Sequence, residues 1–149
     1  MLNLSKSYPT LLVLLALTAC NFPKDPHSAF ENARKNGLKI GVVHNPPYTK
    51  VENTTFSGSE ILYLREFCKK ERLQYHFEFG NETYLIKKLK EYKLDIVAGG
   101  FQESSIWKKE AGISKPYDKK HVFLIPKGEN QLLYYLENFI ANNKLNEKK

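Results

Sequence analysis

The sequence predicts an α/β fold, a three-layer sandwich with a mostly parallel sheet. Short apolar runs alternate with segments of helical periodicity between residues 38 and 126. Strands separated by helices need right-handed crossovers, which bring the strands side by side in parallel. The runs are also followed by turn residues, and the loops after parallel strands gather at one edge of a sheet. Small molecules bind at that edge in open α/β sheets, so the pattern favours a binding module.

Four apolar runs predict the strands of this sheet. Each run is short and is bounded by Gly, Pro, Asn or Asp, as expected for strands that are largely buried. The last run stops at Pro126, whose missing N–H ends a strand. The expected strands cover residues 38–43, 73–79, 95–98 and 121–125.

The second expected strand differs from the others because its residues alternate. Tyr75, Phe77 and Phe79 occupy one side and polar residues the other, which predicts a half-buried strand near the edge of the sheet. His76 lies on the polar side, and we expect a solvated side chain there rather than a ligand.

Helix-starting residues precede the segments with helical periodicity. Ser57 and Glu60 have the spacing of a capping box, in which each side chain hydrogen-bonds a backbone N–H of the other residue. Asn81 is a suitable cap for the next helix. The helices are expected from about Ser28 to Gly37, from near Ser57, from Asn81 and from about Asn130.

The first residues form a targeting segment that does not belong to the fold. The apolar run 11–17 is shorter than the roughly 18 residues that a membrane span needs. It ends in Leu17-Thr18-Ala19-Cys20, which resembles the lipobox of bacterial lipoproteins. That resemblance implies cleavage before Cys20 and acylation of this residue, including palmitate, which anchors a protein without a spanning helix. The alternative is an ordinary secretory signal with an incidental Cys20.

The domain boundaries follow from this interpretation. We expect a lipoprotein signal peptide at 1–19, a tether and short helix at 20–36, a single folded lobe at 37–143 and a polar tail at 144–149. Removal of the signal peptide takes away one Lys and no acid, so the formal charge of +7 falls to +6. The Lys residues are scattered in pairs without a recognition motif, so nucleic acid is not an expected partner. Cys68 is expected to be a buried, unreactive thiol.

Four pieces of the chain occur in a recognisable order. Together they resemble the family 3 type of bacterial extracellular solute-binding protein, which serves ABC importers and includes many amino-acid binders. The resemblance covers about residues 38–127 and implies one lobe of a periplasmic-binding-protein-like fold. The pieces are Ile40-Gly41-Val42 leading to Pro46-Pro47-Tyr48, then Gly58-Ser59-Glu60-Ile61, then Leu94-Asp95-Ile96-Val97-Ala98-Gly99-Gly100, and finally Ile113-Ser114-Lys115-Pro116-Tyr117.

Two departures from the family pattern affect the expected ligand. Family members that bind amino acids carry an Arg after the third strand, and Trp107 stands at that position here. An indole has one donor and no charge, so it cannot replace a guanidinium that grips a carboxylate. In addition, the run 122–130 resembles the segment that returns from the second lobe, so we expect the second lobe to be missing.

The candidate ligand residues lie at the expected strand ends. Tyr48 either stacks on a ligand or shapes its loop, and Glu60 either accepts from a ligand amine or, as its spacing favours, completes the capping box. Gly100 allows close approach of a ligand or a tight turn. Core packing is the alternative for Phe101 and Trp107, and a structural role for Tyr117. The full set is Tyr48, Glu60, Gly100, Phe101, Gln102, Ser105, Trp107 and Tyr117.

The leading hypothesis is a membrane-anchored, periplasm-facing lipoprotein that binds or senses a small polar solute. One lobe supplies one wall of a site, so we expect weak binding by the monomer, strengthened by a homodimer or an envelope protein partner. Asn21 beside Cys20 favours the outer membrane over the inner membrane. The alternative is an envelope protein-docking module that has lost its solute. The sequence has no catalytic motif, and we expect no catalytic residues, no cofactor and no metal site.

Overall fold

Five strands form the central sheet of the computed structural model, which describes residues 25–143. The expected signal peptide, Cys20 and the tail 144–149 lie outside these residues. Among the described residues, no helix combines the length and the apolar character that crossing a membrane requires. The elements are α2 (Ala29–Asn36), β1 (Leu38–Val42), β2 (Lys50–Glu52), β3 (Thr55–Ser57), α3 (Ser59–Glu71), β4 (Tyr75–Phe79), α4 (Glu82–Lys90), β5 (Ile96–Gln102), η2 (Ile106–Lys109), β6 (Gly112–Ile113), β7 (His121–Ile125) and α5 (Asn130–Asn142).

The sheet has the strand order β4-β1-β5-β7-β6. β1 pairs in parallel with both β4 and β5, and the crossover helices α3 and α4 connect these parallel strands along the chain. β7 instead runs antiparallel to β5 and β6. Residues 121–125 form a strand as predicted, and its antiparallel direction is where the sheet departs from a fully parallel arrangement. The connection from β5 to β7 contains the short 3-10 helix η2 and the strand β6. It has no crossover α-helix to return the chain to the end of the sheet where β5 begins, so β7 runs in the opposite direction.

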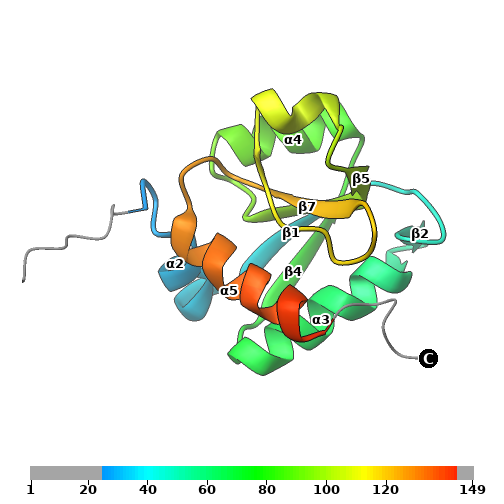
Figure 1. The fold of residues 1–149 in the computed structure, drawn as a ribbon. Helices are drawn as coiled ribbons and strands as arrows, with labels where there is room; N and C mark the ends of the chain where they lie inside the picture. Colours follow the sequence, from blue (N-terminus) through cyan, green and yellow to red (C-terminus); the bar gives the residue numbers. More distant parts are fainter. Residues whose placement is uncertain (1–24, 144–149) are drawn as a thin grey trace, which may run out of the picture.

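Helices cover both faces of the sheet, as the predicted three-layer sandwich requires (Figure 1). On one face, α2, α3 and α5 pack on side chains such as Ile40, Ile96 and Phe123. On the other face, α4 packs on Val97 and Leu124. Neighbouring residues of β5 and β7 thus belong to different cores, because successive side chains of a strand point to opposite faces. The predicted α/β class is confirmed.

The four predicted helix starts agree with the structure to within two residues, but one predicted cap does not. The side chain of Asn81 accepts a hydrogen bond from the Tyr84 N–H at 2.9 Å, so the predicted cap of α4 is confirmed. α3 begins at Ser59, two residues after Ser57. Ser57 ends β3, and Gly58 occupies the cap position without a side-chain bond, so the predicted capping box is wrong.

β4 lies at the edge of the sheet, as predicted, but its aromatic face is only partly buried. Phe77 is covered by Phe56, with 5.1 Å between the ring centroids, whereas Tyr75 is 37% exposed and Phe79 is 56% exposed. An edge strand has a neighbour on one side only, so fewer side chains cover it. Phe56 covers the middle of β4 and leaves Tyr75 and Phe79 at its two ends exposed. Cys68 is buried as expected, and burial raises the pKa of its thiol to about 12.

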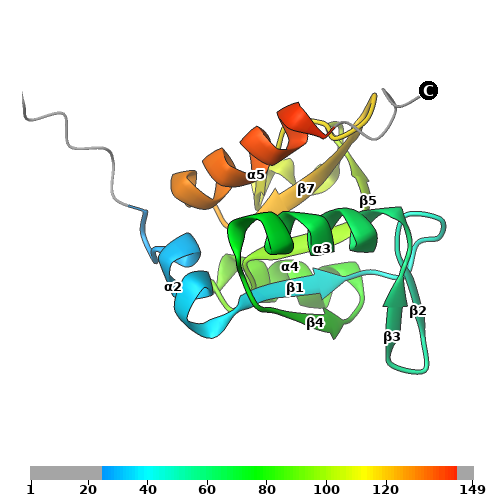
Figure 2. The ribbon, with the colours of Figure 1, turned by 90° about the horizontal axis from the view of Figure 1, so that it is seen from below.

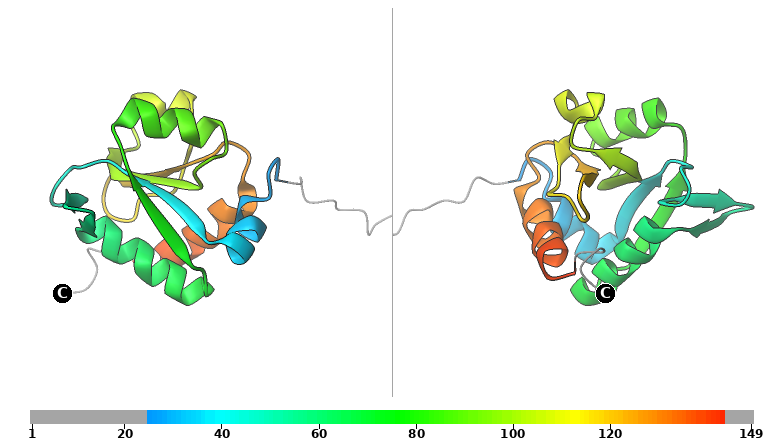
Figure 3. Two further views of the ribbon diagram at one scale, coloured as in Figure 1. Left: turned by 180° about the vertical axis from the view of Figure 1, so that it is seen from behind. Right: turned by 45° about the vertical axis from the view of Figure 1, so that its right-hand side comes forward.

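A short hairpin, β2–β3, was not anticipated from the sequence. It stands beside the first turn of α3 and projects from the body of the domain (Figure 3). It lies at the opposite end of the molecule from α2 (Figure 2).

Two carboxylates cap two helices reciprocally near the first described residues. Asp25 accepts hydrogen bonds from the Asn130 and Gln131 N–H groups, both at 2.9 Å, and so caps α5. Glu129 accepts from the His27 and Ala29 N–H groups, at 2.7 and 2.8 Å, and so caps α2. Each helix thus has its first N–H groups satisfied by a residue about 100 positions away in the sequence.

Replacing Asp25 by Ala is expected to lower the free energy of unfolding by about 1 kcal/mol, the usual value of a helix cap. Asp25→Asn keeps one acceptor oxygen and should lose less than half of that amount. Urea denaturation monitored by circular dichroism would measure both. Equal stability of Asp25→Ala and the unaltered chain would show that Asp25 does not cap α5 in solution.

Candidate functional site

The loop after β1 is tied to the end of β5. The side-chain amide of Asn45 donates to the carbonyl oxygen of Gly99 at 2.8 Å. The Asn45 N–H donates to the Thr49 carbonyl at 2.9 Å, and the Thr49 hydroxyl donates to the carbonyl of Val43. These bonds close the loop and place the Tyr48 ring next to Gly100, where a Cβ would lie 2.6 Å from ring atom Cδ2.

The same loop lies against the first turn of α3. The N–H groups of Ser59 and Glu60 donate to the carbonyl oxygens of Pro47 and Tyr48, at 3.2 and 2.9 Å. Gly58 has φ +111°, and a Cβ there would lie 2.4 Å from the Tyr48 carbonyl oxygen. The close approach therefore requires Gly at position 58. It also means that these two N–H groups of the helix are already satisfied and are not open to an anion.

Glu60 is fully buried behind this loop and joins three parts of the chain. Its carboxylate oxygens both lie 3.1 Å from the Gly100 nitrogen, which donates to them, and the Tyr117 hydroxyl donates to Oε1 at 2.5 Å. Burial raises the pKa of Glu60 to about 7, although the hydrogen bonds from Tyr117 and from the Gly99 and Gly100 amides oppose the rise. Burial also raises the pKa of the Tyr117 hydroxyl far above its ordinary range. Glu60 thus fixes α3 to the end of β5 and to the segment before β7.

A histidine–carboxylate pair completes the group. His121 Nδ1 lies 2.7 Å from Asp118 Oδ2, and the N–H groups of Lys120 and His121 donate to Asp118 Oδ1. Burial acts to raise the pKa of Asp118, but the hydrogen bonds from Lys120 and His121 outweigh burial and hold it below the ordinary range. The Tyr48 ring packs on the His121 ring, with 4.3 Å between centroids.

These residues meet at the end of the sheet to which β1 and β5 point. We refer to them as the strand-end cluster. Asp118 and His121 were not predicted as site residues. The available signal was a carboxylate and an imidazole three residues apart, directly after Pro116-Tyr117. Gln102 is exposed and pairs with His121 across β5 and β7, so it borders the cluster. The cluster consists of Tyr48, Glu60, Gly100, Tyr117, Asp118 and His121.

Three other candidate residues lie elsewhere. Phe101 is buried in the core beneath α4, on the other face of β5 from Gly100. Trp107 packs against the same core, and its indole N–H donates to Glu82 Oε2 at 2.7 Å. Ser105 caps η2 by accepting from the Trp107 N–H at 3.3 Å. The structure thus places Phe101 and Trp107 where core packing, the alternative considered for both, accounts for their contacts.

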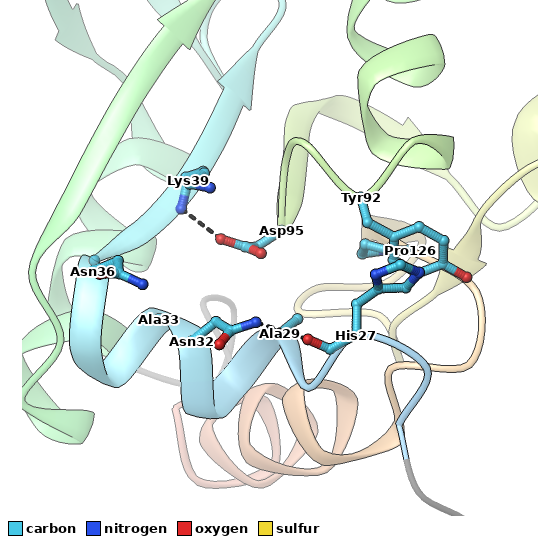
Figure 4. Close-up of a pocket in the computed structure, with 10 residues that line it drawn as sticks. His27, Ala29, Asn32, Ala33, Asn36, Lys39, Tyr92, Asp95 and Pro126 are labelled. Carbon is cyan, nitrogen blue, oxygen red and sulfur yellow. Dashed lines mark hydrogen bonds between the residues drawn. The ribbon is translucent and has the colours of Figure 1, made fainter.

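A small hollow lies at the opposite end of the sheet, where the strands begin (Figure 4). Asp95 points into it and accepts a hydrogen bond from the Lys39 N–H at 2.8 Å. Burial raises the pKa of Asp95 to about 6, and the hydrogen bond from Lys39 opposes this. His27 stacks on Tyr92, with 3.8 Å between centroids. Asp95 thereby ties the start of β5 to the start of β1, which gives it a structural role.

The strand-end cluster combines buried groups, Glu60, Tyr117 and His121, with the half-buried Tyr48, Gly100 and Asp118. It offers an aromatic face, an imidazole and carboxylates with hydrogen-bonding neighbours. Within residues 25–143, no three His, Cys, Asp or Glu side chains are grouped so that they could hold a metal ion.

Comparison with known proteins identifies similar sequences and structures. The model of the bacterial extracellular solute-binding proteins, family 3, matches residues 38–148. None of the curated proteins compared with the chain matches it. A point mutant of the arginine-bound form of domain 1 from TmArgBP is 20% identical, with a TM-score of 0.70, and the match covers 76% of this chain and 97% of that chain.

Two further structures have the same fold. An ancestral cationic amino acid solute-binding protein is 14% identical, with a TM-score of 0.68, and the match covers 75% of this chain and 92% of that chain. A mutant of ArgBP from T. maritima is 11% identical, with a TM-score of 0.69, and the match covers 76% and 92% of the two chains. At these identities the likeness extends to the fold.

Proposed function

The chain belongs to the bacterial extracellular solute-binding proteins of family 3, and on this basis we propose that it is a membrane-anchored, periplasm-facing lipoprotein that binds or senses a small polar solute. The solute binds at the strand-end cluster. The observation that carries this proposal is the placement of Tyr48 over His121 and beside Gly100, at the carboxyl ends of β1 and β5.

A binding site on a single lobe has a precedent among the similar structures. Domain 1 from TmArgBP is described in an arginine-bound form, and the match covers 91% of that chain. A lone lobe buries a smaller part of a solute than a closed pocket does. We therefore expect dissociation constants near the millimolar range for the monomer, and tighter binding where a homodimer or an envelope protein supplies the opposite wall.

The groups at the cluster restrict the chemistry of the solute. Position 107 lacks the Arg that grips a carboxylate, and Pro47 and Tyr48 occupy the N–H groups of Ser59 and Glu60. Free α-amino acids are therefore disfavoured. Asp118 and Gln102 can accept hydrogen bonds at the border of the cluster, while the Tyr48 ring offers a stacking face. A solute with hydroxyl or amine donors and a flat apolar face fits this set.

Replacing Tyr48 by Ala is expected to weaken solute binding about fivefold, because a stacking contact contributes about 1 kcal/mol. Isothermal calorimetry against peptides, sugars and polar metabolites would identify the solute and measure this loss. Tyr134→Ala is the matched control, because Tyr134 is 62% exposed on α5 and lies outside the cluster. No binding of any solute at millimolar concentration would contradict the proposal.

The membrane attachment has an independent test. We expect Cys20 to be the first residue of the mature chain and to carry acyl chains, with Asn21 beside it favouring the outer membrane. Mass spectrometry of the chain extracted from membranes would detect them, and Cys20→Ala should release the protein from the membrane fraction. An unmodified mature chain would refute the lipoprotein assignment and leave the solute site untouched.

A second candidate function is an envelope protein-docking module. It is favoured by exposed apolar side chains near the same end of the sheet, since Ile106 is 77% exposed in η2 and Phe79 is exposed at the end of β4. Crosslinking from Tyr48 to one defined protein, combined with no solute binding, would support this candidate over the first.

A further inference from the structure

Basic side chains gather at the end of the sheet where β1 and β4 begin. α2 leads directly into β1 and α3 leads directly into β4, so the last turns of both helices lie at this end. The Leu38 N–H donates to the Gln74 carbonyl at 2.7 Å, and Lys39 is the pairing partner of His76. We call this surface the basic end. It comprises Lys35, Lys39, Lys69, Lys70 and Arg72, all of them exposed.

The exposed charges of the basic end are mostly positive. None of the five side chains takes part in the ion pairs found among residues 25–143. The carboxylates of Asp25 and Glu129, which lie at this end, accept hydrogen bonds from backbone N–H groups instead. Glu71, half-buried in the last turn of α3, is the acidic residue on the same helix end. Glu66 is exposed one turn before Lys69 and Lys70, whereas Glu71, Asp25, Glu129 and Asp95 are half-buried or buried, so the exposed side chains at this end remain mostly basic.

Part of this pattern has a local explanation. Basic residues in the last turn stabilise a helix by interacting with its dipole, and both α2 and α3 carry them there. Arg72 is the C-cap residue of α3 and interacts with the same dipole, whereas Lys39 lies in a strand, so the dipole does not account for Lys39. The helix dipoles therefore account for four of the five basic residues, but the side chains are exposed and still make this end of the domain positive.

The N-terminal part of the chain joins the domain at the same end. Asp25 is held at the start of α5, and α2 lies at the far end of the molecule from the β2–β3 hairpin (Figure 2). In the sequence, Asp25 follows Cys20 closely, with only residues 21–24 between them. Even fully extended, that segment spans about 18 Å. An anchor at Cys20 would keep the basic end within a few Debye lengths of the bilayer, since one Debye length is about 8 Å at physiological salt.

From these observations we propose that the basic end docks on the anionic lipid headgroups of the membrane that holds the N-terminus, and that the strand-end cluster consequently faces away from the bilayer. This proposal rests on the membrane attachment proposed above. Basic residues close to an anionic bilayer are attracted to it, and the attraction is screened by salt. The docking leaves the solute site open to the periplasm and to a partner that completes it.

The test uses the full chain coupled through Cys20 to a maleimide lipid, so that it does not depend on natural acylation. Cys68 is buried and does not compete for the coupling. The vesicles contain phosphatidylcholine with or without phosphatidylglycerol, and amide hydrogen exchange is measured by mass spectrometry. Adding the anionic lipid is expected to slow exchange in residues 34–39 and 69–76 but not in residues 117–121. High salt is expected to abolish this slowing.

Two matched triple variants separate docking from overall charge. Lys69→Gln, Lys70→Gln and Arg72→Gln together should weaken docking about a hundredfold, because each basic residue contributes about fivefold. Lys50→Gln, Lys119→Gln and Lys120→Gln remove the same charge near the other end and should leave docking unchanged. Equal protection on neutral vesicles, equal effects of both variants, or protection of residues 117–121 instead would overturn the proposal. Solute titration on the same vesicles reports separately on the strand-end cluster.

Discussion

Replacing Glu60 by Ala is expected to lower the free energy of unfolding by about 3 kcal/mol. The substitution leaves the buried Tyr117 hydroxyl and the Gly100 N–H without their acceptor, and each such loss costs about 1–3 kcal/mol. Urea denaturation at pH 5 would measure the change. Glu103→Ala, at an exposed position after β5, is the matched control and should stay within about 0.5 kcal/mol of the unaltered chain.

The titration of Glu60 is expected to make the free energy of unfolding depend on pH. Because the folded pKa of about 7 exceeds the ordinary value of 4.5, the folded state binds the Glu60 proton more tightly than the unfolded state does. The resulting stabilisation is complete below pH 4.5 and is lost as the pH rises through about 7, a change of about 3 kcal/mol. Asp95 acts in the same direction between pH 3.8 and about 6, so the loss above pH 6 belongs mainly to Glu60.

The substitution Glu60→Gln isolates this contribution, because the amide keeps an acceptor oxygen for Gly100 or Tyr117 and does not titrate. Between about pH 6 and pH 7.5 the stability of this variant should fall much less than that of the unaltered chain, and the remaining fall belongs to Asp95. If Glu60→Gln left the pH slope unchanged, Glu60 would not be the buried group that binds the proton.

Replacing Gly58 by Ala is expected to destabilise the domain by about 3 kcal/mol or more. Gly58 has φ +111°, which side chains rarely adopt, and the new Cβ would lie 2.4 Å from the Tyr48 backbone oxygen. The loop would have to move away from α3, which displaces Tyr48 from His121 and weakens solute binding as well. Thermal denaturation and calorimetry would measure the two effects.

The neighbouring position supplies the control for Gly58. Ser59→Ala changes a residue in the first turn of α3 and keeps the backbone N–H that bonds to Pro47. We expect a change within about 0.5 kcal/mol. A loss below about 1 kcal/mol for Gly58→Ala would mean that the loop does not pack against the helix as described.

The layers of the fold were predictable because apolar periodicity decides which faces are buried. Ile96 and Val97 are adjacent in a short apolar run, and they enter the two different cores that a central strand separates. Asn81 was predictable as a cap because its partner, Tyr84, lies three residues away. The direction of β7 was not predictable in this way, since it depends on a connection whose residues have no helical period.

The site was less predictable than the fold because its contacts span long distances along the chain. Ser57 and Glu60 match the spacing of a capping box, yet Glu60 bonds to Gly100 and Tyr117, which are 40 and 57 positions away. A local pattern cannot distinguish these outcomes. The same holds for Gly100, which was expected in a loop and lies within β5, where it has a positive φ and packs against Tyr48.

The most direct test of the solute site is amide chemical-shift mapping by NMR with the solute that binds most tightly in calorimetry. We expect the largest shifts at Tyr48, Gly100 and His121, with smaller ones along the end of β5. Shifts confined to the groove between α3 and α5, near Leu62 and Phe139, or to the hollow around Asp95 would contradict a site at the carboxyl ends of the strands.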